Sequence, residues 1–93
     1  MGNPVLIDFY ADWCGPCRTQ TPIIEKLEKK FGDRVEFRKV NVDENRQMAT
    51  KYGVRSIPTL AIEVDSKIVK QFVGLTQADT IEAALNEALS APK

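Results

Sequence analysis

The sequence contains no histidine and only two cysteines. Histidine is the commonest general base and the commonest metal ligand at neutral pH, so its absence excludes Ser-His-Asp and Cys-His catalysis within this chain. A zinc site needs about four ligands, which two cysteines supply only with a second chain or with added carboxylates. We therefore expect no metal and no other cofactor.

The chain also lacks a net charge and a long apolar run. Its 13 basic residues balance 13 acidic ones, which gives no electrostatic reason to expect a nucleic acid or an anionic membrane as a partner. No apolar stretch approaches the roughly 18 residues of a membrane span, and the first residues do not resemble a secretory signal. We expect a cytoplasmic monomer.

The periodicity of the apolar residues, which make up 43% of the 93 residues, predicts one small α/β domain over residues 1–93. Thr76 and Asp79 resemble a capping box at the start of the last helix. The order begins like a parallel βαβ unit and ends with a hairpin, which predicts a mixed sheet with helices packed on it. The expected elements are strand 5–10, helix 14–31, strand 35–42, helix 43–52, strand 59–64, strand 67–73 and a helix from residue 76.

The two cysteines belong to the motif Cys14-Gly15-Pro16-Cys17, where the first expected strand leads into the first helix. A helix N-terminus presents unpaired N–H groups and a partial positive charge, which favour a thiolate at Cys14. Cys17 lies one turn further along, so we expect it to be more buried and less acidic. This arrangement predicts thiol–disulfide exchange, with Cys14 attacking and Cys17 resolving.

Three alternative roles for the cysteine pair stay open at this point. The cysteines could belong to a zinc site that a second chain completes. They could form a purely structural disulfide, although so short a loop stabilises a fold little. They could also be inert and buried, which Gly15 and Pro16 between them disfavour. Within an α/β chain, two cysteines at this spacing are moderate evidence for redox activity.

Four segments of the chain resemble the thioredoxin family in order and in spacing. They are residues 5–17, 39–45, 52–60 and 73–75. The resemblance implies the thioredoxin fold, with a four-stranded mixed sheet because only four residues precede the first strand, where most members have a further strand and helix. It implies reduction of protein disulfides through a Cys14–Cys17 dithiol cycle. Its partners would be disulfide-containing client proteins and a thioredoxin reductase or equivalent electron donor.

Carried over residue by residue, the resemblance gives the cysteines three supporting residues. Asp8 would be a buried carboxyl that exchanges a proton with Cys17, Lys39 its buried cationic neighbour, and Pro58 a cis-proline whose loop packs against the disulfide. The implied apolar docking surface consists of Trp13, Gly15, Pro16, Ile57, Pro58, Gly74 and Leu75.

Asp8, Lys39 and Pro58 each have a simpler alternative. Asp8 interrupts an apolar run, where a lone buried carboxylate is costly and is expected to be protonated or paired; the alternative is an Asp that faces water at a strand edge. Lys39 is in phase with Val35 and Phe37, yet buried lysines are uncommon, and the alternative is a solvated Lys. Most X–Pro bonds are trans, so a cis Pro58 is implied by the resemblance alone.

Two rival functions are also open. A glutaredoxin-like enzyme would act on glutathione mixed disulfides, but its usual dipeptide between the cysteines is Pro-Tyr rather than Gly15-Pro16. A redox-inert binding module would use the same fold for interaction only. The intact cysteine pair, together with Asp8 and Pro58, disfavours such a module.

Overall fold

The apolar run Val5–Tyr10 forms strand β1 in the interior of a four-stranded sheet. The computed structural model describes residues 2–90. The other strands are β2 (Glu36–Asn41), β3 (Thr59–Val64) and β4 (Lys67–Val73), and the sheet order is β2-β1-β3-β4. β1 pairs in parallel with β2 and antiparallel with β3, and β3 pairs antiparallel with β4. The predicted mixed sheet is therefore confirmed.

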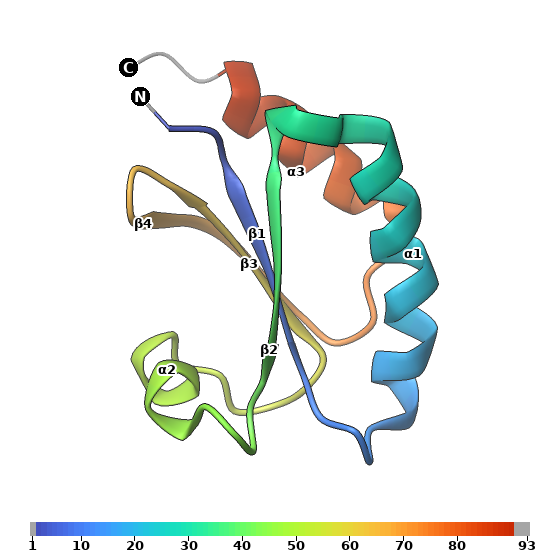
Figure 1. The fold of residues 1–93 in the computed structure, drawn as a ribbon, viewed down its shortest axis with the longest axis vertical. Helices are drawn as coiled ribbons and strands as arrows, with labels where there is room; N and C mark the ends of the chain where they lie inside the picture. The colour runs from blue at the N-terminus through green and yellow to red at the C-terminus, as the bar shows by residue number, and fades with distance from the viewer. Residues whose placement is uncertain (1, 91–93) are drawn as a thin grey trace.

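The helices cover both faces of this sheet. They are α1 (Gly15–Phe31), α2 (Arg46–Lys51) and α3 (Ala78–Ser90). Figure 1 shows α1 and α3 on one side of the sheet and α2 on the other. Successive side chains of β1 point to opposite faces, so Leu6 joins the cluster under α1 and α3 while Ile7 and Phe9 join the cluster under α2. Burial on both faces explains why this strand is a continuous apolar run.

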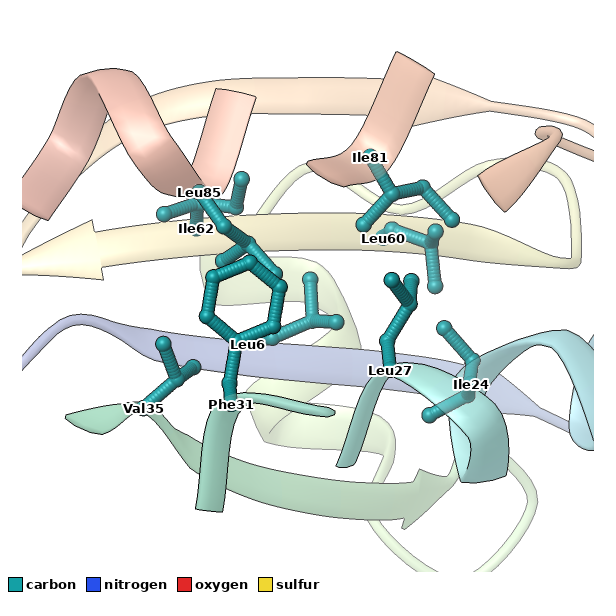
Figure 2. Packing of buried hydrophobic residues seen from close by; sticks show 9 residues of the cluster. All are labelled: Leu6, Ile24, Leu27, Phe31, Val35, Leu60, Ile62, Ile81 and Leu85. Carbon is teal, nitrogen blue, oxygen red and sulfur yellow. The ribbon is translucent and has the colours of Figure 1, made fainter. Parts of the chain in front are cut away.

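The larger core lies between the sheet and the helices α1 and α3 (Figure 2). Burying one Leu, Ile, Val or Phe side chain stabilises a fold by about 1.5–3 kcal/mol, so this cluster is what holds α1 against β1. Its buried residues are Leu6, Ile24, Leu27, Phe31, Val35, Leu60, Ile62, Ile81 and Leu85.

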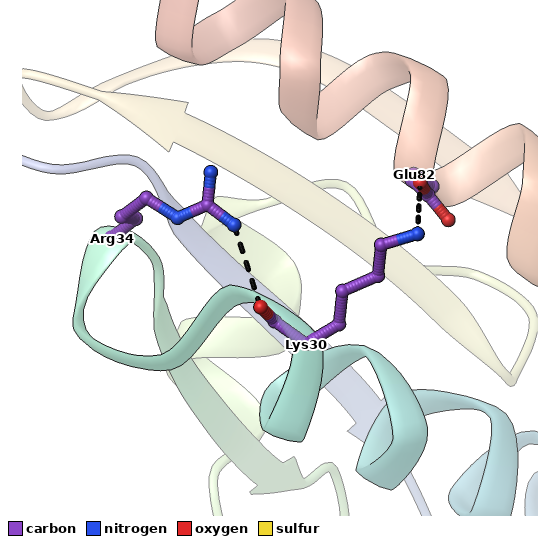
Figure 3. Close-up of polar contacts among 3 residues, drawn as sticks. All are labelled: Lys30, Arg34 and Glu82. Atoms are coloured by element: carbon purple, nitrogen blue, oxygen red, sulfur yellow. Dashed lines mark hydrogen bonds and ion pairs between the residues drawn. The ribbon is translucent and has the colours of Figure 1, made fainter.

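Polar contacts at the far end of α1 add little to this core. Lys30 Nζ lies 2.6 Å from Glu82 Oε2 and so joins α1 to α3, while Arg34 Nη2 donates to the Lys30 carbonyl at 3.4 Å (Figure 3). The side chain of Lys30 is 57% exposed, and exposed ion pairs typically contribute about 0.2–1 kcal/mol. The placement of α1 therefore depends mainly on apolar burial rather than on these exposed polar contacts.

α1, α2 and α3 all begin later than the sequence predicted, α1 by a single residue because Cys14 is its N-cap. α2 begins three residues late, because Asn41 Oδ1 accepts a hydrogen bond from the Asp43 N–H at 2.9 Å and holds the chain in a local turn. α3 begins at Ala78, and the Thr76 hydroxyl donates backwards to the Gly74 carbonyl at 2.9 Å. The predicted capping box is therefore wrong.

The edge strand β2 carries exposed charged side chains. On the edge strand β2, Arg38 Nε lies 2.5 Å from Glu36 Oε2, and both side chains are about half exposed. Charged side chains of this kind discourage pairing with a further strand.

The hairpin between β3 and β4 turns at Asp65 and Ser66, whose φ angles of 52° and 69° are typical of a two-residue hairpin turn. Among residues 2–90, no helix has the length and apolar character to span a membrane.

Candidate functional site

The two cysteines form a disulfide where β1 ends and α1 begins, with Cα atoms 5.3 Å apart. Cys14 is the N-cap of α1, and its Sγ accepts a hydrogen bond from the Cys17 N–H at 3.2 Å. Pro16 occupies the first turn, where its missing N–H has no helical partner to lose. That turn contains no acidic residue, so no carboxylate offsets the partial positive charge of the helix end. The site therefore favours a negative sulfur at Cys14 once the disulfide is reduced.

Burial does not distinguish the two cysteines. Cys14 is 3% exposed and Cys17 is 4% exposed, so the expectation that Cys17 is the more buried is wrong for the disulfide form. Both pack in one small apolar cluster with Ala11, against the partly buried Val42 and Ile57, because the bond between their sulfurs holds them together. What distinguishes Cys14, the predicted attacking thiol, from Cys17, the predicted resolving thiol, is the N-cap position of the Cys14 sulfur.

Asp8 is buried in the middle of β1, as the resemblance implied, with 2% of its surface exposed. Its Oδ1 has no hydrogen-bond partner among the described residues. Burial raises the pKa of this carboxyl from 3.8 to about 6, and the positive charge of Lys39 partly opposes that rise. Asp8 also lines a pocket of about 150 Å³ together with Lys39 and Glu28. A carboxyl with a pKa this close to neutrality can both take and release a proton near pH 7.

Lys39 is the direct neighbour of Asp8 in the register of β1 and β2, but it is exposed. The expectation that it is buried is therefore wrong. β2 is an edge strand, so a long side chain on it reaches water with its ammonium group. Lys39 Nζ lies 4.7 Å from the centre of the Tyr10 ring, so an aromatic face holds the cation beside the site.

Two loops that are distant in sequence meet near the disulfide. The Ile57–Pro58 peptide bond is cis, as the resemblance implied, and Ile57 packs against the cysteine cluster. The Gly74 N–H donates to the Pro58 carbonyl at 2.8 Å. Gly74 has a φ of 89°, a left-handed conformation that favours glycine. The fold thus joins residues 57–58 to residue 74.

The residues predicted to form a docking surface differ in exposure. Trp13 is 68% exposed and Leu75 is 42% exposed, and Gly15 and Pro16 are exposed as well. Ile57, Pro58 and Gly74 are more buried. Contiguous apolar groups at a protein surface are typical of a binding site.

The sequence prediction missed two polar residues at this site. Asp43 Oδ2 accepts a hydrogen bond from the Trp13 indole N–H at 2.9 Å, a contact that depends on the turn after β2 and leaves no local sequence signal. Gln20 is completely buried on α1. A signal for Gln20 was present, because it is a polar residue in line with Cys17 and Ile24 on the buried stripe of the helix.

Comparison with known proteins agrees with this geometry. The family model "Thioredoxin" matches residues 1–87. The thioredoxin of Bacillus subtilis is 42% identical over 91% of this chain and 82% of its own length. Thioredoxin 1 of Synechococcus elongatus is 44% identical over 92% of this chain and 80% of its own length. The solved structure of a mutant thioredoxin from Halobacterium salinarum matches with a TM-score of 0.89 at 37% identity, over 99% of this chain and 80% of that one.

These matches establish the family, because the family model and both relatives each cover about nine tenths of this chain. Membership implies disulfide-containing substrates and a reductase that supplies electrons. The chain belongs to the thioredoxin family, and it is a thiol–disulfide oxidoreductase with Cys14 and Cys17 as its redox-active pair.

Proposed function

We propose that this protein reduces protein disulfides, with Cys14 as the attacking thiolate and Cys17 as the resolving thiol. The observation that carries the proposal is the hydrogen bond of 3.2 Å from the Cys17 N–H to Cys14 Sγ. A negative sulfur at this N-cap gains a charge-assisted hydrogen bond and the favourable end of the helix dipole. Cys17 Sγ occupies no such cap position, which supports the assignment of the two roles.

The cycle has two exchange steps. In the first, the Cys14 thiolate attacks a substrate disulfide, the substrate S–S bond breaks, and the released substrate sulfur takes up a proton. In the second, the Cys17 thiol gives its proton to Asp8 and its sulfur attacks Cys14 Sγ. This step forms the Cys14–Cys17 disulfide and releases the second substrate sulfur, which is then protonated. The substrate gains two electrons and two protons, and a dithiol donor later returns them to the protein.

Asp8 is the proton acceptor in the second step. Its pKa of about 6 leaves it mostly ionised at neutral pH, and therefore able to accept a proton. Its Oδ1 has no competing hydrogen-bond donor among the described residues. Lys39, in register beside it, supplies a positive charge that favours the ionised form.

The docking surface for the substrate chain is formed by exposed and partly exposed apolar groups around the pair. Exposure of Trp13 and Leu75 and the packing of Ile57 against the cysteine cluster support this role. An extended substrate segment would lie beside Pro58, in the manner of an added strand. The proposed surface comprises Trp13, Gly15, Pro16, Ile57, Pro58, Gly74 and Leu75.

We further propose that residues 1–93 act as one domain and as a cytoplasmic monomer. Both cysteines are used in the redox pair, so the fold has no separate structural disulfide of the kind that is common in oxidising compartments. The zero net charge favours neither a nucleic acid nor an anionic membrane as a partner. Light scattering of the purified protein tests the monomer directly.

Reduction of insulin by dithiothreitol, with and without the protein, tests the central proposal. The wild type is expected to accelerate the reaction and Cys14→Ser to abolish the acceleration. Cys17→Ser is the matched control, because it keeps the nucleophile and is expected to accumulate a mixed disulfide that mass spectrometry detects. Equal activity in Cys14→Ser would overturn the assignment. A reduction potential as high as that of protein disulfide isomerase, about −180 mV, would overturn the reducing direction.

A further inference from the structure

One polar side chain interrupts the apolar stripe of α1. Gln20 is 0% exposed and lies one turn after Cys17 on the buried face of the helix, followed by Ile24. A buried carboxamide destabilises a fold unless both its donor and its acceptor are paired. The position of Gln20 therefore requires specific partners.

Both partners of Gln20 belong to the backbone of a single residue. Gln20 Nε2 donates to the Thr76 carbonyl at 2.9 Å, and the Thr76 N–H donates to Gln20 Oε1 at 2.9 Å. Thr76 is itself buried. A closed pair of hydrogen bonds fixes orientation as well as distance, so it restrains the segment between β4 and α3 more tightly than one bond would.

The restraint extends along this segment to the other side of the site. The Thr76 hydroxyl donates to the Gly74 carbonyl at 2.9 Å, and the Gly74 N–H donates to the Pro58 carbonyl at 2.8 Å. Leu75 lies between these two bonded residues and is 42% exposed. Residues 74–76 are thus tied at one end to the Pro58 loop and at the other end to the helix that carries Cys17.

We propose that Gln20 is a positioning residue that holds Gly74 and Leu75 in place relative to the cysteine pair, and so tunes recognition of protein substrates. The inference rests on the proposed function, in which Gly74 and Leu75 contact the substrate chain. α1 carries Cys17 and Gln20 within one turn of each other, so the reacting sulfur and the docking segment share one support. A segment already held in place needs no ordering when the substrate binds.

This role affects large and small disulfides differently. A protein disulfide contacts Leu75 and the sulfurs at the same time, so its binding depends on their relative placement. A small aromatic disulfide such as dithiobis-nitrobenzoate contacts the sulfurs alone. Loss of the Gln20 bonds is therefore expected to weaken binding of the protein substrate and to leave reaction with the small one unchanged.

The test uses Gln20→Met, which keeps a similar length but removes both amide hydrogen bonds. With dithiothreitol as reductant, we expect the insulin concentration at half-maximal rate to rise about 25-fold, the scale of two net hydrogen bonds at about fivefold each. The limiting rate and the rate constant with dithiobis-nitrobenzoate are expected to stay unchanged. Leu85→Ala is the control, because it destabilises the core under α3 and removes neither of the two hydrogen bonds between Gln20 and Thr76.

Gln20→Glu is a second variant that separates the hydrogen bonds from packing. A buried carboxyl has a raised pKa, and in its protonated form it can donate to the Thr76 carbonyl and accept from the Thr76 N–H as the amide does. Relative to wild type at the same pH, its insulin half-saturation is expected to be normal at about pH 6 and raised about fivefold at about pH 8.

The outcomes distinguish this inference from the proposed function. A wild type that turns over both disulfides, with Gln20→Met equally active on both, contradicts the role of Gln20 alone. Equal losses on both substrates, or a rise in insulin half-saturation of the same size in Leu85→Ala, also contradict it. A wild type that reduces neither disulfide contradicts the proposed function, and the inference with it.

Discussion

The ionisation of Asp8 gives the sharpest test of the site, and Asp8→Asn is the variant that isolates it. The side chain is 2% exposed, its Oδ1 has no partner among the described residues, and burial raises its pKa from 3.8 to about 6. A raised pKa means that the folded state binds this proton more tightly than the unfolded chain does. The stability of the wild type is therefore expected to fall as the pH rises from about 4 to about 6 and to stay lowered above that range.

The size of this loss follows from the two pKa values. Each pKa unit corresponds to about 1.4 kcal/mol, so the rise from 3.8 to about 6 amounts to about 3 kcal/mol of unfolding free energy. Asn does not ionise and so carries no such loss. The stability of Asp8→Asn relative to wild type is expected to be about 2.5 kcal/mol greater at about pH 8 than at about pH 4, because part of the loss has already occurred at pH 4.

Urea unfolding of the oxidised proteins over a series of pH values measures this difference. The chain has no histidine and a single tryptophan, so no imidazole titrates in this range and fluorescence reports one site beside the disulfide. Asp33→Asn is a matched control, since Asp33 is exposed and its replacement is expected to change stability little at any pH. Parallel curves for wild type and Asp8→Asn would refute the reasoning, because they would mean that Asp8 titrates alike in the folded and unfolded states.

Two further variants test other parts of the site. Lys39→Met removes the charge that lowers the pKa of Asp8. In the same urea series, the pH-dependent loss of stability is therefore expected to end at a higher pH than in the wild type. An unchanged pH profile would show that Lys39 does not act on Asp8. Gly74→Ala is expected to lower stability by about 1–2 kcal/mol, because a Cβ there meets no atom within 4 Å and the φ of 89° is the only obstacle. Gly15→Ala, which also meets no atom within 4 Å and lacks a positive φ, is its control; equal stability of both variants would count against backbone strain at residue 74.

Much of the site could be predicted from the sequence because local rules act on it. The run 5–10 is largely apolar because both faces of β1 are covered, and the amino-acid sequence by itself shows this pattern. The location of the cysteine pair at the start of α1 was predictable, because the pair lies where the strand pattern ends and the amphipathic helix pattern begins. Burial of Asp8 follows from its place within the run, once the sheet has helices on both sides.

Other features depend on contacts that no local pattern specifies. Lys39 is in phase with buried residues, yet it is exposed because β2 is an edge strand, and edge position is a property of the whole sheet. The bonds between Gln20 and Thr76 join residues 56 apart in sequence. The sequence shows only that a polar residue stands on an apolar stripe, and the fold supplies its partner.

The opposite environments of Cys14 and Asp8 explain how one small site handles both charge and protons. Cys14 Sγ lies at the positive end of a helix with no acidic residue in its first turn, so the surroundings favour a charge on the sulfur. Asp8 is buried at the lining of a small pocket, where burial opposes its charge and raises its pKa to about 6. Near neutral pH the carboxylate is therefore ionised but ready to be neutralised. In the proposed cycle, a proton that moves from Cys17 to Asp8 removes an unfavourable buried charge, and this gain would favour the step that closes the disulfide.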